Sequence, residues 1–391
     1  MNEEHAGPLK PTDVLPRDVS VEEHEQAVTE TAEPQPAATM RKVFLAPILT
    51  LALTGRSWSP ARLIPMMGRI VFGFPGQLEI FRILKHPAYI DLVRIDPRLP
   101  YKCLTADYLA RGLTIVERQA CFAYHYKRMP ALLPDHQLRQ ALFSWITLEE
   151  IHEDGHTFAL KLGRSRPKNR EGEMSLLLEV DGELTAILSF TLVPGWVVKS
   201  EAREVLFITC LQGKAKRFSE AHLAMKSLHG VAPAAFLIAA LSGVASAFGI
   251  QEMAGICAEC QTCYGKDDNA VFKAAYDDFW IALGATQRSG NFFLCPLPPR
   301  EKPLELVKPG NRPKRKAQRA FKRQIAEKVC NLLRESRSEE IRDSLIAFVE
   351  HPPRPAAPEF ECQPPAPSSA FPKEAAQKDN QEPKEKVVSL H

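Results

Sequence analysis

Three cysteines at a regular spacing are the first residues whose pattern suggests chemistry. Cys257, Cys260 and Cys263 form a Cys-x-x-Cys-x-x-Cys run, and thiolates so spaced can bind zinc or an iron–sulfur cluster. A closed zinc site needs a fourth ligand, and no second cysteine pair follows, so Cys295 or His229 would serve only if the fold brought it close. Cys257 also ends a predicted strand, where small apolar residues are common. We therefore expect no metal and keep these cysteines as weak candidates.

A group of bases follows a predicted buried strand. Gln212 and Gly213 precede Lys214, Lys216 and Arg217. Three bases beside a turn at the end of a central strand suit a bound phosphate group. The alternative is a solvated turn with ordinary surface charges.

Two further residues are candidates for proton transfer. His229, followed by Gly230, could act as a general base near neutral pH; Gly230 would join the anion site. The alternative is a capping histidine beside a glycine kept for its backbone freedom. Tyr276 could protonate a leaving thiolate, but packing with Phe279 and Trp280 is the favoured explanation.

Residues 314–333 predict a basic amphipathic helix. Apolar side chains recur every three or four residues, and the bases crowd the first half: Lys314, Arg315, Lys316, Arg319, Lys322 and Arg323. Such a helix can lie on an anionic membrane surface. It can equally dock its apolar stripe on the protein and leave the charges in water. Nucleic acid is a weaker alternative, because no interleaved aromatics or known binding motif accompany the bases.

The secondary structure that must position these residues changes along the chain from helices to a mixture of strands and helices. Before residue 150, apolar periodicity predicts helices over 77–85, 105–129 and 137–150. After Gly155, Asp181-Gly182 between two apolar runs predicts a hairpin, because both positions tolerate positive φ. Further strands are expected at 204–211, 252–257 and 291–295, with helices at 233–248 and 269–283. Strands joined by helices favour an α/β (α+β) fold, a mixed sheet flanked by helices.

Composition divides the chain into five parts. We expect a disordered acidic tail at 1–39, a helical region at 40–150, an α/β core domain at 151–300, the basic amphipathic segment at 301–350 and a disordered Pro-rich tail at 351–391. The two tails hold too few apolar groups to offset the entropy of ordering.

Charge and cysteine content exclude several classes of protein. The net charge of +3 over 391 residues gives no general case for nucleic acid, and nine scattered cysteines do not resemble a secreted disulfide framework. We do not expect the acidic N-terminus to be a signal peptide. The uncharged helix at 233–248 is about 24 Å long, shorter than a bilayer core of roughly 30 Å. We therefore expect a cytoplasmic protein, with the basic helix as a route to peripheral attachment at the inner membrane.

Several segments, in a fixed order, carry a resemblance to a known family. They are VLFITCLQG (205–213), LHGVAP (228–233), YDDFWIALG (276–284), the basic run at 314–317 and Glu171-Gly-Glu173. Together they resemble the VirK/YbjX family of bacterial proteins over residues 75–335; one departure is Ala285, where a second glycine is expected. The resemblance implies a domain of unknown function, linked to virulence and envelope stress in Gram-negative bacteria, with no agreed catalytic residues.

The order of the strands is also similar to that of the GNAT acyltransferases. That similarity implies an acyl-CoA cofactor, whose pyrophosphate is bound by backbone amides where the central strand turns into a helix. The signature Gln/Arg-x-x-Gly-x-Gly/Ala is missing after the strand, which continues as QGKAKR. Two hypotheses follow: an accessory factor in envelope stress or virulence, and an acyl-CoA-dependent acyltransferase-like enzyme.

Overall fold

The structure is a computed structural model that describes most of the chain between residues 73 and 350. The described residues are 69, 73–166, 170–213, 225–262, 264, 273, 276–288 and 292–350, with side chains as far as Arg337. The two predicted tails lie outside these residues, as do Lys214, Lys216, Arg217 and Cys263.

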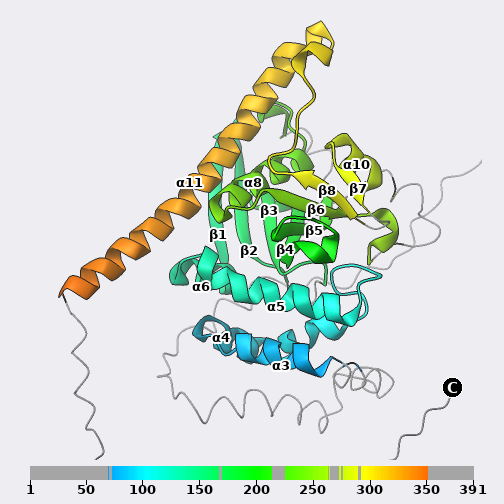
Figure 1. The fold of residues 1–391 in the computed structure, drawn as a ribbon. Helices are drawn as coiled ribbons and strands as arrows, with labels where there is room; N and C mark the ends of the chain where they lie inside the picture. The colour runs from blue at the N-terminus through cyan, green and yellow to red at the C-terminus, as the bar shows by residue number, and fades with distance from the viewer. Residues whose placement is uncertain are drawn as a thin grey trace, which may run out of the picture. The chain divides into compact units, whose positions relative to one another are not determined.

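An eight-stranded sheet forms the centre of the described chain (Figure 1). The strands lie in the order β1-β2-β3-β4-β5-β6-β8-β7, and every neighbouring pair is antiparallel except β5–β6. Their bounds are β1 Trp145–Glu153, β2 His156–Arg164, β3 Met174–Val180, β4 Glu183–Pro194, β5 Glu204–Gly213, β6 Glu252–Ile256, β7 Thr286–Arg288 and β8 Phe292–Pro296. The predicted α/β class with a mixed sheet is confirmed.

Two tight turns create the hairpins of this sheet. Asp181 and Gly182 join β3 to β4 with φ angles of 52° and 77°, as their sequence predicts. Asp154 and Gly155 join β1 to β2 with φ angles of 50° and 79°. This second hairpin is not among the predicted elements, because the apolar spacing over 137–150 predicts a helix.

The helix predicted over 137–150 is wrong in its second half. Helix α6 is Asp135–Phe143, and the chain then turns into β1. Ile146 and Leu148 are buried with an exposed residue between them, which is strand periodicity. Over so few residues, the apolar spacing fits both the helical and the strand period. The residues form a strand because they pair with β2. The helix predicted from residue 105 likewise begins only at Ile115, because Thr114 and Glu117 form a capping box there.

Helices surround the sheet. Helices α5 and α6 lie across one end of the strands, and α3 and α4 pack beyond them (Figure 1). Helix α8 packs on β3, β4 and β5. The remaining bounds are α3 Phe74–Ile83, α4 Pro87–Ile95, α5 Ile115–Leu132, α8 Pro233–Phe248, α10 Asp277–Ala282 and α11 Arg312–Glu350, with 3-10 turns at Leu99–Leu104, Gly195–Val198, Ala258–Cys260, Leu304–Leu306 and Pro309–Asn311.

Helix α8 has the bounds that the sequence predicts, and Gly249 ends it in the left-handed conformation with φ of 74°. Helix α11 packs directly on it: a Cβ on Gly243 would lie 2.4 Å from the carbonyl oxygen of Ala326 and 2.8 Å from Cβ of Val329. The apolar stripe of α11 is therefore docked on the protein, with Ile325, Val329 and Leu333 buried. Within the described part of the chain, no helix is both long and apolar enough to cross a membrane.

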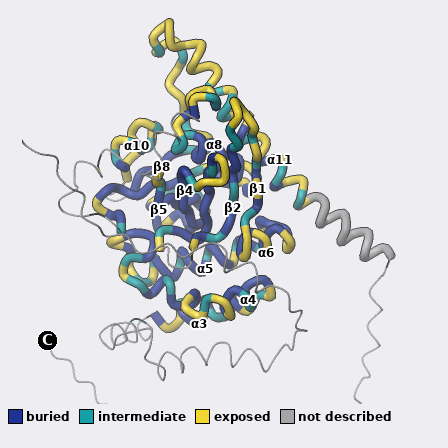
Figure 2. Tube along the Cα trace, turned by 180° about the vertical axis from the view of Figure 1, so that it is seen from behind, coloured by how far each residue is buried: buried dark blue, intermediate teal, exposed yellow. Residues whose placement is uncertain are grey.

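Burial falls sharply toward the start of α11. The strands and α8 are largely buried, whereas the turns before α11 and its first residues are almost all exposed (Figure 2). The bases that crowd this part of the chain are thus available at the surface.

Candidate functional site

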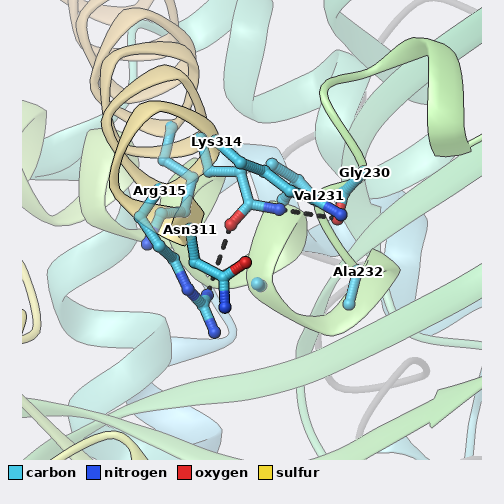
Figure 3. Close-up of a pocket in the computed structure, with 9 residues that line it drawn as sticks. Gly230, Val231, Ala232, Asn311, Lys314 and Arg315 are labelled. Carbon is cyan, nitrogen blue, oxygen red and sulfur yellow. Dashed lines mark hydrogen bonds between the residues drawn. The ribbon is translucent and has the colours of Figure 1, made fainter. Parts of the chain in front are cut away.

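An open cavity of about 360 Å³ lies where α11 begins beside the N-terminus of α8 (Figure 3). Its lining comes from two stretches far apart in the sequence: Gly230, Val231, Ala232 and Ala235 around the start of α8, and Asn311, Lys314, Arg315, Gln318 and Lys322 at the start of α11. We call it the basic cavity. It brings together Gly230 and three of the bases that the sequence separately marked as candidates.

Helical spacing points one row of side chains at the cavity. Lys314, Gln318 and Lys322 are four residues apart, which places them on one face of α11. The amide of Gln318 donates to the carbonyl oxygens of His229 (3.2 Å) and Gly230 (3.0 Å). These two residues have positive φ angles of 55° and 63°, so the turn they form exposes both carbonyls to Gln318. Gln318 thus ties the two walls together.

The bases around the cavity are unequally neutralised. Lys322 pairs with Glu301, and Arg319 Nε lies 2.7 Å from Glu301 Oε2. Lys314 has no carboxylate partner among the described residues, and the described hydrogen bond of Arg315 goes to the uncharged Gln318, at 3.2 Å. Two cations therefore face the cavity without a counter-charge in the described chain.

The N-terminus of α8 adds to this positive potential. Its N-cap, Ala232, has no side chain that could accept from the first amides of the helix. The amides of the first turn have no intrahelical acceptor, and the helix dipole places partial positive charge there. Unneutralised bases beside such a terminus favour an anion, and phosphate has a suitable size and charge.

The six bases predicted as one surface divide into three groups. Lys314, Arg315 and Lys322 line the basic cavity. Arg319 instead holds the segment before α11, through Glu301 and the carbonyl oxygen of Lys302. Lys316 and Arg323 are exposed and do not line the cavity.

Comparison with known proteins identifies the family. A family model described as a protein of unknown function (DUF535) matches residues 73–330. The chain belongs to this family, the VirK/YbjX family. Neither a curated protein nor a solved structure matches it. The matched residues include the whole sheet, α8, the basic cavity and α11 as far as residue 330.

The two predicted proton-transfer residues lie on different elements. The ring of His229 is exposed and meets Phe321 of α11 edge-on, with ring centroids 5.3 Å apart. Tyr276 is buried at the N-cap of α10. Neither side chain lines the basic cavity, so their catalytic roles stay predictions.

Gln212 and Gly213 are exposed at the end of β5, paired with Ile187 and Ala186 of β4. The bases that follow them lie outside the described residues. Strands β5 and β6 pair only from Leu206–Met253 to Ile208–Gly255. Beyond that point, the buried Gln261 side chain donates to the carbonyl oxygen of Thr209 and so bridges the two diverging segments.

Of the three spaced cysteines, Cys257 and Cys260 are buried at the end of β6, and Cys263 lies outside the described residues. The described residues contain no group of three or more His, Cys, Asp or Glu side chains suited to a metal ion.

Asn311 and Gln318 belong to the cavity but were not predicted. The signal that could have found Gln318 is its spacing, four residues from both Lys314 and Lys322. Its partners are the carbonyls of His229 and Gly230, 89 and 88 residues away, which no local pattern reveals.

Proposed function

We propose that this protein is a non-enzymatic accessory factor that binds phosphate-bearing head groups of anionic lipids through the basic cavity. The observation that carries the proposal is the presence of Lys314 and Arg315, without a described carboxylate partner, beside the uncapped start of α8. A role in envelope stress or virulence is what the VirK/YbjX family resemblance implies.

A membrane surface explains more of the charge than a single small anion does. Residues 300–323 hold ten bases and two acids, and most of these residues are exposed. Each base near an anionic membrane contributes about 1 kcal/mol. Since the apolar stripe of α11 is docked on α8, attachment would be electrostatic and would involve no insertion of that stripe.

Vesicle co-sedimentation tests the proposal. The full chain is mixed with vesicles of phosphatidylcholine alone or with about a third of phosphatidylglycerol. We expect binding only to the anionic vesicles, and a loss of about tenfold in affinity for Lys314→Ala with Arg315→Ala, equivalent to about 1.4 kcal/mol.

A charge-matched variant serves as the control. Lys85→Ala with Lys127→Ala also removes two exposed bases, but from the turn after α3 and from α5, and it should bind as the parent chain does. Equal losses of vesicle affinity in the two double variants would mean that binding depends on net charge alone. Unchanged binding in Lys314→Ala with Arg315→Ala would refute the role of the cavity. Inorganic pyrophosphate as a competitor distinguishes a lipid head group from a free phosphate compound as the ligand. If micromolar pyrophosphate displaces the protein from the vesicles, the ligand is a free phosphate compound.

An acyl-CoA-dependent transferase is the second candidate, supported by the parallel pair β5–β6, whose two strands are connected in the sequence through α8. Coenzyme A also carries phosphates, which Lys214, Lys216 and Arg217 after β5 are predicted to bind. In a thermal-shift assay, acyl-CoA at 100 times its Kd would stabilise the protein by about 2.7 kcal/mol. A shift abolished by Lys214→Ala with Lys216→Ala would favour this candidate over lipid binding.

A further inference from the structure

Cys257 and Cys260 form a thiol pair that the proposed lipid binding does not use. Cys257 follows β6 as the N-cap of the 3-10 turn Ala258–Cys260, and the amide of Cys260 donates to the carbonyl oxygen of Cys257 at 3.2 Å. In such a turn the first and fourth Cα atoms are less than about 7 Å apart, which is within reach of a disulfide.

The turn is anchored on both sides. The amide of Ala258 donates to Asp277 Oδ1 of α10 at 2.8 Å, and the amide of Arg111 donates to the carbonyl oxygen of Cys260 at 2.9 Å. The Arg111 guanidinium also donates to the carbonyl oxygens of Thr262 and Tyr264. The backbone around the two thiols is therefore fixed by groups that a bond between the sulfurs would not disturb.

The Cys257 and Cys260 thiols also share a hydrogen bond, which is not among the causes of the pKa shifts of Cys103, Cys121 and Cys295. A hydrogen bond from the Cys260 thiol lowers the pKa of Cys257 to about 7, while the same contact and burial raise the pKa of Cys260. Burial instead raises the pKa of Cys295 to about 11, and it raises the pKa values of Cys103 and Cys121. Because the thiolate is the reactive form, Cys257 is the most nucleophilic of these thiols near neutral pH.

We propose that Cys257 and Cys260 are a redox-active dithiol that exchanges with small disulfides. Cys257 exposes 6% of its surface and Cys260 8%, which leaves little room to reach the sulfurs, so the reagent we propose is a low-molecular-weight disulfide and not a protein one.

The exchange proceeds in two balanced steps. The Cys257 thiolate attacks one sulfur of the small disulfide, forms a mixed disulfide and expels one small thiolate. The Cys260 thiol then loses its proton and attacks the Cys257 sulfur, which expels the second small thiolate. The protein dithiol is oxidised by two electrons to a disulfide, and the reagent is reduced to two thiols, which take up the two protons.

The test treats the reduced full chain with glutathione disulfide, alkylates the remaining thiols and measures the tryptic peptide that contains residues 257–263. We expect that peptide to lose two hydrogens in the parent chain and in Cys263→Ser. Cys260→Ser should instead accumulate a glutathione adduct on Cys257, and Cys257→Ser should form neither product.

Three results would overturn the proposal. A disulfide that disappears in Cys263→Ser would assign the bond to Cys263. Stoichiometric zinc in the purified protein, released only when these cysteines are alkylated, would make them metal ligands. A parent chain that stays reduced, while glutathione disulfide oxidises a control dithiol peptide in the same solution, would show that the pair is inert. Circular dichroism of each variant separates these results from misfolding.

Discussion

Glu173 is a buried carboxylate held by a small polar cluster. Lys102 Nζ lies 2.9 Å from Glu173 Oε1, and the hydroxyl of Tyr126 donates to Oε2 at 2.7 Å. Burial alone would raise the pKa of Glu173, but Lys102, His125 and Tyr126 together hold it below its ordinary value. The charge is therefore kept in the interior by its partners.

Removing Lys102 should be more harmful than removing the whole pair. Lys102→Met leaves the Glu173 charge buried without its cation, and we expect a loss of about 3–5 kcal/mol in the free energy of unfolding. Lys102→Met with Glu173→Gln removes both charges and should recover part of that loss. Urea unfolding at pH 7 measures both variants, and equal losses would show that the ion pair itself is not what stabilises this region.

His125 makes the stability depend on pH. It is fully buried, accepts a hydrogen bond from the amide of Leu192 at 3.2 Å, and burial lowers its pKa to about 4. The unfolded chain takes up a proton near pH 6.5 and the folded chain only near pH 4, so the stabilisation is present above pH 6.5 and is lost as the pH falls toward 4.

Between pH 7 and pH 5, we expect the free energy of unfolding to fall by about 2 kcal/mol because of His125. His125→Gln should flatten this dependence, whereas His136→Gln, a change at an exposed histidine, should retain it. Urea titrations at the two pH values measure the difference. The same slope in His125→Gln and the parent chain would contradict the assignment.

At the scale of elements, the contact between α8 and α11 depends on a residue without a side chain. A Cβ at Gly243 would overlap the backbone of Ala326 and the side chain of Val329, so the two helices must separate to admit it. A similar contact joins α10 to β6, where the Trp280 ring covers Gly255 and its Nε1 donates to the carbonyl oxygen of Ile256 at 3.0 Å.

Gly243→Ala should loosen α11 and lower the free energy of unfolding by about 1–3 kcal/mol, the usual cost of overpacking. Gly310→Ala is the control, because nothing lies within 4 Å of a Cβ there, and it should change little. Hydrogen exchange of the α11 amides follows the loosening directly. Unchanged protection in Gly243→Ala would mean that the helices adjust without separating.

At the scale of the whole molecule, the proposed membrane binding depends on the charge of the basic cavity together with that of the exposed bases around it. Raising the salt concentration from 0.1 M to 1 M shortens the screening length from about 10 Å to about 3 Å. Binding to anionic vesicles should therefore weaken by about tenfold or more, a change of at least about 1.4 kcal/mol. Co-sedimentation across a salt series measures it, and salt-independent binding would indicate apolar insertion instead.

Local patterns in the sequence determined the bounds of α8, one hairpin and the family of this protein. Pro233 and Gly249 marked the ends of α8, Asp181-Gly182 marked a hairpin, and the order of motifs identified the family, because each of these depends on residues close together in the chain. Only the tertiary structure shows that β1 is a strand, because its apolar residues fit both the helical and the strand period and the pairing with β2 selects the strand. Only the tertiary structure shows the basic cavity, because Gln318 donates to a carbonyl oxygen 88 residues away in the chain. Only the tertiary structure shows that the apolar stripe of α11 is docked, because helical periodicity predicts an apolar face but not the surface that covers it.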